Sequence, residues 1–267
     1  GSVAHRCQAR IADLEVSNGS GDVNATRYFG EAQYVAADDA AAGHKNNNAS
    51  YRPLSVSGSG TAWSFTAIGS TQREQAGIRA WKDTDPTVSE ADVVTQEDGG
   101  MTALVIVAAQ ATSLGGGIYH YEYAVQNLNS DRSIGSVSIP IRPDANVTNI
   151  EFRDVDYHDG DGPGNVNYNG TDWPPVVANS SVTWSTEDFS VNANANALRW
   201  GTLYNFRFDA DVAPWAGKGT VTLGYFKPGT GTAATVQTVT PYPCINGDLN
   251  GDAVVDGREA IQWNTSF

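Results

Sequence analysis

The feature that most constrains the fold of this chain is the alternation of large apolar and polar residues in short segments separated by turn-forming residues. The clearest case is residues 118–125, where three tyrosines recur at every second position. Successive side chains of a strand point to opposite faces of a sheet, so a period of two predicts a β-strand. A second alternating segment, residues 134–139, follows a polar cluster typical of turns and ends at Pro140, which cannot donate to a ladder. We predict that these two segments form a central β-hairpin.

Shorter alternating segments occur along much of the chain, and a series of short strands with turns between them is typical of a β-sandwich. We therefore predict an all-β fold, an antiparallel β-sandwich body over residues 1–240 whose first 60 residues carry the weakest pattern. An Ala-rich segment, residues 31–42, is compatible with a short helix. The further predicted strands are residues 10–16, 62–68, 77–82, 102–109, 149–157 with a bulge after Phe152, 181–185, 203–209, 220–226 and 233–240.

Composition excludes two classes of partner. The chain has 30 acidic residues against 16 basic ones and a formal net charge of -14. Such a chain is repelled by nucleic acid phosphates and by anionic lipid surfaces. Its longest apolar run, residues 103–109, is far shorter than the roughly 20 residues that a membrane-spanning helix needs. We expect neither a nucleic acid partner nor a membrane span.

The two cysteines, Cys7 and Cys244, lie near opposite ends of the chain. A disulfide between them would close most of the chain into one loop, which the loop-entropy model values at roughly 5 kcal/mol. The alternative is two unrelated buried thiols. We predict the disulfide, because other features also point to a location outside the cell. Seven Asn-x-Ser/Thr triplets are candidate glycosylation sites: Asn18, Asn24, Asn48, Asn146, Asn169, Asn179 and Asn264.

The last twenty residues carry the most recognisable chemistry. Starting at Asp248, oxygen-bearing residues recur at positions one, three, five, nine and twelve of a loop, and position seven offers a backbone carbonyl. Ca²⁺ needs six to eight oxygen ligands, and this spacing folds one loop around the ion. Ala253 departs from the pattern, because the sharp turn at position six favours glycine. The predicted calcium ligands are Asp248, Asn250, Asp252, the Val254 carbonyl, Asp256 and Glu259, followed by a short exiting helix at 258–264.

This C-terminal segment resembles a dockerin repeat, a small calcium module found at the ends of many secreted bacterial proteins. We therefore treat residues 241–267 as a separate dockerin-like tail. Dockerins carry two such repeats and bind cohesins through paired helices, whereas this chain has one repeat. The segment 248–257 is similar to dockerin-type anchors of exported planctomycete proteins. Body segments 121–130 and 200–208 are similar to uncharacterised exported proteins of the same group, which implies an extracellular, secreted or cell-surface location and no particular activity.

A second acidic stretch lies after the predicted strand at 149–157. It offers Asp154, Asp156, Asp159 and Asp161 to another cation, but their spacing fits no standard calcium loop. The alternative is a solvated hairpin end.

The chain contains no nucleophile elbow, phosphate-binding Gly-Lys-Ser/Thr loop or His-Glu-x-x-His zinc helix. Its four histidines are scattered, and His120, between two tyrosines, is expected to be structural. Glu74, Glu122 and Glu151 are imaginable members of a glycosidase carboxylate pair. Any acidic β-protein offers as many carboxylates, so we expect no enzyme.

The seven tryptophans allow a different interpretation, because sugar-binding sandwiches stack rings on exposed aromatic side chains. Trp173 and Trp215 lie in predicted loops, and for each of them sugar stacking and packing are equally open. We expect the remaining three candidates to pack: Trp63, Trp184 and Trp200. We predict a non-catalytic extracellular structural or adhesive component. It would self-assemble into a surface layer or filament, with copies of itself or neighbouring surface proteins as partners and calcium in its tail. The alternative is a carbohydrate-binding module of a polysaccharide-processing system.

Overall fold

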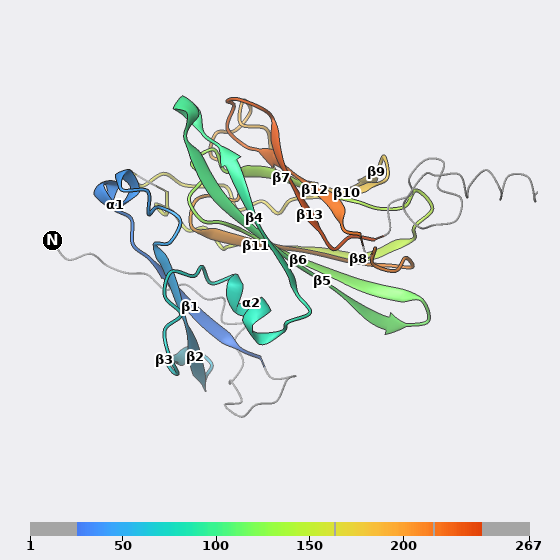
Figure 1. The fold of residues 1–267 in the computed structure, drawn as a ribbon, viewed down its shortest axis with the longest axis horizontal. Coiled ribbons are helices and arrows are strands. Elements are labelled where there is room, and N and C mark those ends of the chain that lie inside the picture. The colour runs from blue at the N-terminus through green and yellow to red at the C-terminus, as the bar shows by residue number, and fades with distance from the viewer. Residues whose placement is uncertain (1–25, 163, 216, 242–267) are drawn as a thin grey trace, which may run out of the picture. The chain divides into compact units, whose positions relative to one another are not determined.

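The computed structural model describes residues 26–162, 164–215 and 217–241, which form three antiparallel sheets (Figure 1). The all-β prediction is confirmed. The chain divides into two compact units between Ala80 and Trp81, a boundary that the sequence pattern did not predict. Among the described residues, no helix has the length and apolar character needed to cross a membrane.

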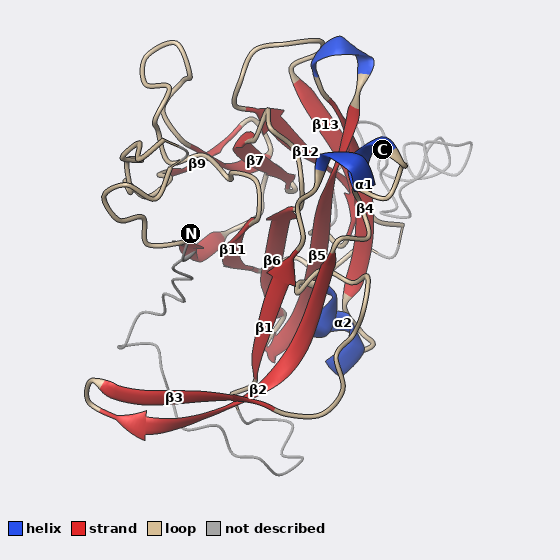
Figure 2. Cartoon of the chain, turned by 90° about the vertical axis from the view of Figure 1, so that its left-hand side faces the viewer, coloured by secondary structure: helices blue, strands red, loops and turns tan. Residues whose placement is uncertain are grey.

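The first unit contains a three-stranded sheet with the order β1-β2-β3. Its strands are β1 (Tyr28–Gln33), β2 (Ala49–Ser59) and β3 (Ala62–Ala67), and α1 (Ala37–Ala41) lies between the first two in sequence. Figure 2 shows β2 and β3 as a long hairpin. Gly58 is required at the end of this hairpin, because its φ is 136° and a Cβ there would lie 2.1 Å from the Ala62 carbonyl oxygen.

Two predictions about this part of the chain were wrong. The start of the expected helix at 31–42 belongs to β1, where Glu31 pairs with Tyr51 of β2, and only Ala37–Ala41 are helical. Most of the expected strand at 77–82 lies in the helix α2 (Arg79–Thr84). The Asp85 N–H donates to the Trp81 carbonyl, the four-residue spacing of a helical hydrogen bond. Six alternating residues are too few to distinguish a strand from one helical turn.

The second unit is a sandwich of two five-stranded antiparallel sheets. One sheet has the order β4-β5-β6-β11-β8 and the other has the order β13-β12-β7-β10-β9 (Figure 1). The strands of the first are β4 (Ser89–Gln96), β5 (Thr102–Gly115), β6 (Ile118–Asn127), β11 (Thr202–Ala210) and β8 (Val147–Arg153). Those of the second are β13 (Ala233–Thr238), β12 (Gly219–Tyr225), β7 (Ile134–Pro140), β10 (Ser181–Ser185) and β9 (Pro175–Ala178).

The core between these sheets is filled by aromatic rings at alternate strand positions. Tyr121 of β6 and Phe208 of β11 are fully buried and stack with ring centroids 5.3 Å apart. Trp184 of β10 packs against Phe206 from the opposite sheet at 5.4 Å. The buried Tyr121 hydroxyl donates to the Val212 carbonyl at 2.7 Å, which satisfies its polar end. This inward face leaves the alternate residues of β6 and β11 pointing outward.

The predicted hairpin between residues 118–125 and 134–139 was wrong, although both strands exist. β6 pairs with β5 and β11, so both of its edges are occupied, and β7 lies in the other sheet. The hairpin partner of β6 is β5, joined through Gly116 and Gly117 with φ of 62° and 84°. Residues 128–133 are a crossover from one sheet to the other.

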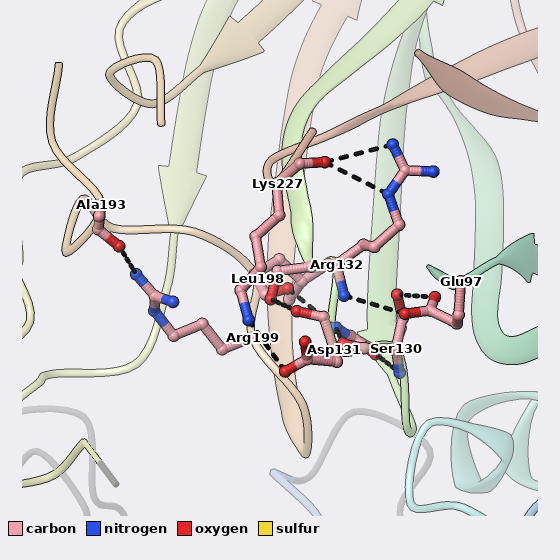
Figure 3. A network of polar contacts seen from close by, with 10 residues as sticks. Glu97, Ser130, Asp131, Arg132, Ala193, Leu198, Arg199 and Lys227 are labelled. Atoms are coloured by element: carbon pink, nitrogen blue, oxygen red, sulfur yellow. Dashed lines mark hydrogen bonds and ion pairs between the residues drawn. The ribbon is translucent and has the colours of Figure 1, made fainter. Parts of the chain in front are cut away.

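This crossover is held by Arg132, which is 3% exposed. Its guanidinium donates to the carbonyls of Lys227 (3.2 Å), Gln96 (3.1 Å), Thr230 (2.8 Å) and Gly231 (2.9 Å) and lies 3.8 Å over the Tyr225 ring. Gln96 ends β4, whereas the other three carbonyls belong to the β12–β13 turn. Arg132 therefore connects one end of both sheets. Figure 3 shows the same crossover held by Glu97, which accepts from the Ser130 hydroxyl at 2.6 Å and the Arg132 N–H at 3.1 Å.

Candidate functional site

The candidate site is a polar pocket on the outward face of β6, β11 and β8. It has a volume of about 370 Å³, is open to solvent and lies at the low end of the roughly 300–1,000 Å³ range of ligand pockets. The outward residues of these strands alternate with the buried aromatic residues described above, so the rigid core fixes their backbone positions. Five polar or charged residues line the pocket: His120, Asn149, Glu151, Arg207 and Asp209.

One row of this face is a cross-strand chain of charges. Arg207 of β11 is paired in register with Glu122 of β6 on one side and with Glu151 of β8 on the other. Its Nη2 lies 2.9 Å from Oε2 of Glu151, its Nε donates to the same oxygen at 3.0 Å, and its Nη1 lies 3.7 Å from Oε2 of Glu122. The guanidinium therefore lies between two carboxylates that come from strands about two strand spacings, roughly 10 Å, apart at the backbone, and it contacts both of them.

The neighbouring row is built around Asp209. His120 of β6 is in register with Asp209, and its Nδ1 lies 2.6 Å from Oδ1 of that carboxylate. Its Nε2 lies 3.3 Å from Oε2 of Glu122, so the imidazole links the two rows. Asn149 donates through Nδ2 to the other oxygen of Asp209 at 2.6 Å.

Asn149 reaches Asp209 because β8 is irregular at this point. The pairing of β8 with β11 shifts register between Arg207 and Asp209, leaving two residues of β8, Asn149 and Ile150, opposite one residue of β11. Asn149 has φ of 49°, a left-handed conformation that asparagine tolerates better than most residues. Bulges of this kind turn a side chain to a new direction.

The surroundings move the pKa values of two carboxyls in opposite directions. Burial raises the pKa of Glu122, and Arg207 and His120 only partly offset this. For Asp209, burial alone would raise the pKa, but hydrogen bonds from Asn149 and His120 together outweigh it and lower the pKa. The site thus holds Asp209 as an acceptor-only carboxylate at neutral pH.

A carboxyl with a raised pKa near an ionised one is also the pattern of a glycosidase acid–base pair. In this face, however, Arg207 occupies the space between Glu122 and Glu151 at the level of the sheet. The third carboxylate considered from the sequence, Glu74, belongs to the other unit. The arrangement is suited to binding a polar molecule from above the sheet.

The predicted calcium ligands from Asp248 to Glu259, and both cysteines of the predicted disulfide, lie outside the described residues. They remain predictions. The same holds for the sequons at Asn18, Asn24 and Asn264. Of the other sequons, Asn146 and Asn179 are exposed, whereas Asn48 and Asn169 are half-buried.

The four aspartates of the candidate second cation site do not converge. Within residues 26–162, 164–215 and 217–241 no group of three or more His, Cys, Asp or Glu side chains is arranged to hold a metal ion. Asp154 accepts a hydrogen bond from the buried Asn196, whose amide oxygen accepts from the Tyr204 hydroxyl at 2.6 Å. Asp161 instead accepts from the backbone N–H of His158 at 2.7 Å. Asp154 and Asp161 thus help to order the loop that follows β8.

Burial decides between sugar stacking and packing for one of the two candidate tryptophans, Trp173, and leaves Trp215 a prediction. Trp173 is 1% exposed and packs on Phe152 with ring centroids 5.5 Å apart, so it belongs to the core. Trp215 is half-buried. Of those expected to pack, Trp184 is fully buried and Trp200 is 45% exposed.

Sequence reasoning named Glu122 and Glu151 only as imaginable members of a glycosidase pair and gave His120 a structural role. It missed that Arg207, Asp209 and Asn149 lie beside them on one face. One signal was present in the sequence. The apolar residues of β8 are Val147, Ile150 and Phe152, so their spacing changes from three to two at Asn149. Such a change of phase marks the bulge, which lies before Phe152 and not after it as predicted.

Comparison with known proteins adds no family to these observations, because neither a family model nor a curated protein matches the chain.

Proposed function

We propose that this chain is a non-catalytic structural or adhesive component outside the cell that assembles with copies of itself or with neighbouring surface proteins. The observation that carries the proposal is the edge strand β9. Among the residues that the structure describes it pairs only with β10, all four of its residues are exposed, and Val176 and Val177 are 55% and 48% exposed. It carries no charged side chain.

β9 is short and begins with Pro175, and both features limit pairing at an edge. It carries neither of the other common protections, a charge or a bulge, so the backbone groups of Val176 and Val177 can still pair with a strand of another molecule. Pairing of β9 with a strand of a second copy would extend the five-stranded sheet across the interface. The tight turn through Asn179 and Ser180, with φ of 51° and 58°, fixes β9 on β10 and so presents it as a preformed edge.

Sedimentation velocity over a range of protein concentrations tests the assembly. We expect the wild type to form larger species as concentration rises, and Val177→Lys to stop this by placing a charge on the edge. Val191→Lys is the matched control, because Val191 is 75% exposed in a loop outside any strand. A wild type that stays monomeric, or a Val177→Lys variant that assembles like the control, contradicts the proposal.

The non-catalytic part of the proposal is supported by Arg207, which occupies the space between the two carboxylates that a hydrolase would use. A screen of polysaccharides and model glycosides tests it. Turnover that is lost in Glu122→Gln would show that the chain is an enzyme.

A carbohydrate-binding module is the second candidate function, and the polar pocket favours it. All five lining residues carry hydrogen-bonding side chains, and they stand on paired strands of one sheet. Binding of the protein to a glycan array tests this candidate separately from assembly.

A further inference from the structure

We infer that the pocket formed by His120, Asn149, Glu151, Arg207 and Asp209 binds one uncharged saccharide ring through its hydroxyl groups. The inference rests on the second candidate function, carbohydrate binding, and assigns to it a site and a ligand class. It places the sugar on the outward face of β6, β11 and β8 and not on the tryptophans of the loops.

The charges of the pocket select against charged ligands. An anionic ligand attracted to Arg207 would have to approach the carboxylates of Glu151 and Asp209, which line the same pocket. A cationic ligand would have to compete with Arg207 for Glu151, 2.9 Å away, and with His120 for Asp209, 2.6 Å away. A neutral ligand avoids both costs, because the carboxylates already have partners on the sheet.

The hydrogen-bonding capacity that remains is mixed, as hydroxyl groups require. The hydrogen bond and the ion pair from Arg207 both end on Oε2 of Glu151, so Oε1 retains its acceptor capacity. The Asn149 amide uses one N–H on Asp209 and keeps a carbonyl oxygen and a second N–H. A sugar hydroxyl both donates and accepts, so neighbouring hydroxyls of one ring match such a mixture.

The side chains are also held in place before a ligand arrives. β11 is paired along both edges, and cross-strand contacts tie Arg207, Asp209 and His120 to their neighbours. Preorganisation of this kind reduces the ordering cost of binding. The lining contains no Trp, Tyr or Phe ring on which a sugar could stack, so we expect hydrogen bonds to dominate the affinity, with a Kd of about 1 mM.

The test is a titration of the full chain by isothermal calorimetry and ligand-observed NMR. The probes are glucose, galactose and mannose, each compared with its uronic acid and its 2-amino sugar. We expect at least one neutral sugar to bind and its two charged counterparts to bind at least about tenfold more weakly. Equal binding of the neutral and charged forms would overturn the inference.

Two variants locate the site. Arg207→Met and Glu151→Ala are each expected to weaken binding about tenfold, and the Glu151 side chain is 54% exposed, so its removal tests the site even where Arg207→Met unfolds. Arg142→Gln is the matched control, since Arg142 pairs with Asp144 in the same unit and does not line the pocket. Sugar binding that survives both variants overturns the inference and leaves carbohydrate binding standing. If the wild type binds none of the three neutral sugars, the inference is overturned, and the glycan array then decides separately whether carbohydrate binding fails as well.

Discussion

Replacement of Arg132 by methionine tests whether the buried guanidinium holds the two sheets of the sandwich together. Methionine keeps an unbranched apolar side chain in the space but removes every donor. Four backbone carbonyls, from Gln96 of one sheet and from the β12–β13 turn of the other, would then lose the hydrogen bond that Arg132 gives them.

The magnitude follows from burial. A hydrogen bond from a charged donor contributes about 1.5–3 kcal/mol net, but several bonds to one group do not add, and the carbonyls regain some water when the turn loosens. A buried carbonyl left without a donor costs about 1–3 kcal/mol, so with partial recovery by water we expect a loss of about 3–5 kcal/mol for the four carbonyls, and the lost cation–π contact with Tyr225 adds to this. Since domains are stable by only about 5–15 kcal/mol, Arg132→Met should remove a large share of the stability of this unit.

Urea unfolding followed by tryptophan fluorescence measures the loss, because Trp173 and Trp184 are buried in this sandwich. With a slope of about 2 kcal/mol/M, a loss of 3–5 kcal/mol lowers the midpoint by about 1.5–2.5 M. Arg132→Lys should fall between wild type and Arg132→Met, because one ammonium offers three donors in place of the planar fork.

Lys227→Met is the matched control for this experiment. The Lys227 side chain makes only a partly exposed ion pair with Asp131 at 2.9 Å, although its backbone carbonyl accepts from Arg132. Its replacement removes a charge from the same turn without removing a bond of the guanidinium and should cost at most about 1 kcal/mol. An Arg132→Met variant no less stable than Lys227→Met would refute the proposed clamp.

Three further predictions concern the polar face and the two ends of the chain. Asp209→Asn should lower stability at neutral pH. Its difference in stability from wild type should shrink as pH falls below 3.8, the ordinary pKa of the carboxyl, because the depressed pKa contributes stability only while Asp209 is ionised. Urea unfolding at about pH 7 and about pH 3 measures this, and a constant difference contradicts it. Glu259→Ala should weaken calcium binding most among single ligand changes, and Ala253→Gly should tighten it, as calorimetry on chelator-treated protein would show; equal affinities of wild type and Glu259→Ala would remove the site assignment. Non-reducing mass spectrometry of a digest should show the Cys7 and Cys244 peptides linked, and two free thiols would reject the disulfide.

The strands of this fold could be read from the sequence where one face is buried and the other is polar. β11 is the best case, because Tyr204, Phe206 and Phe208 point into the core and the residues between them point outward. The predicted segments at 181–185, 203–209 and 220–226 match β10, β11 and β12 within about one residue at each end. β9 was missed because all four of its residues are exposed, which leaves no alternation to detect.

Pairing could not be read with the same certainty, because alternation identifies a strand but not its neighbour. The cluster after β6 contains asparagine and serine, which are typical of turns, and this suggested a hairpin to β7. In the fold the Asn127 side chain accepts from the Ser130 N–H at 2.7 Å and donates to the Leu198 carbonyl at 3.0 Å. These residues satisfy the backbone of a buried crossover, a role with the same composition as a surface turn.

The residues of the polar pocket on β6, β11 and β8 were harder to predict for a related reason. They come from three strands that are far apart in sequence, and only the register of β6, β11 and β8 brings them together. No local spacing could indicate that Asp209 faces His120. The bulge at Asn149 left a trace in the pattern, but its consequence depends on which strand lies opposite.

The crossover and the polar face both follow from the position of β6 in the middle of its sheet. Because β5 and β11 occupy its two edges, the outward residues His120 and Glu122 have cross-strand neighbours on both sides, which a strand at an edge would not have. For the same reason the chain cannot turn back beside β6 after Asn127 and must pass to the other sheet. That passage is buried, so its polar groups need internal partners, and Arg132, Asn127 and Glu97 supply them. A surface built on such a strand is fixed by the core beneath it, and this is why we assign ligand binding to this face and not to the loops.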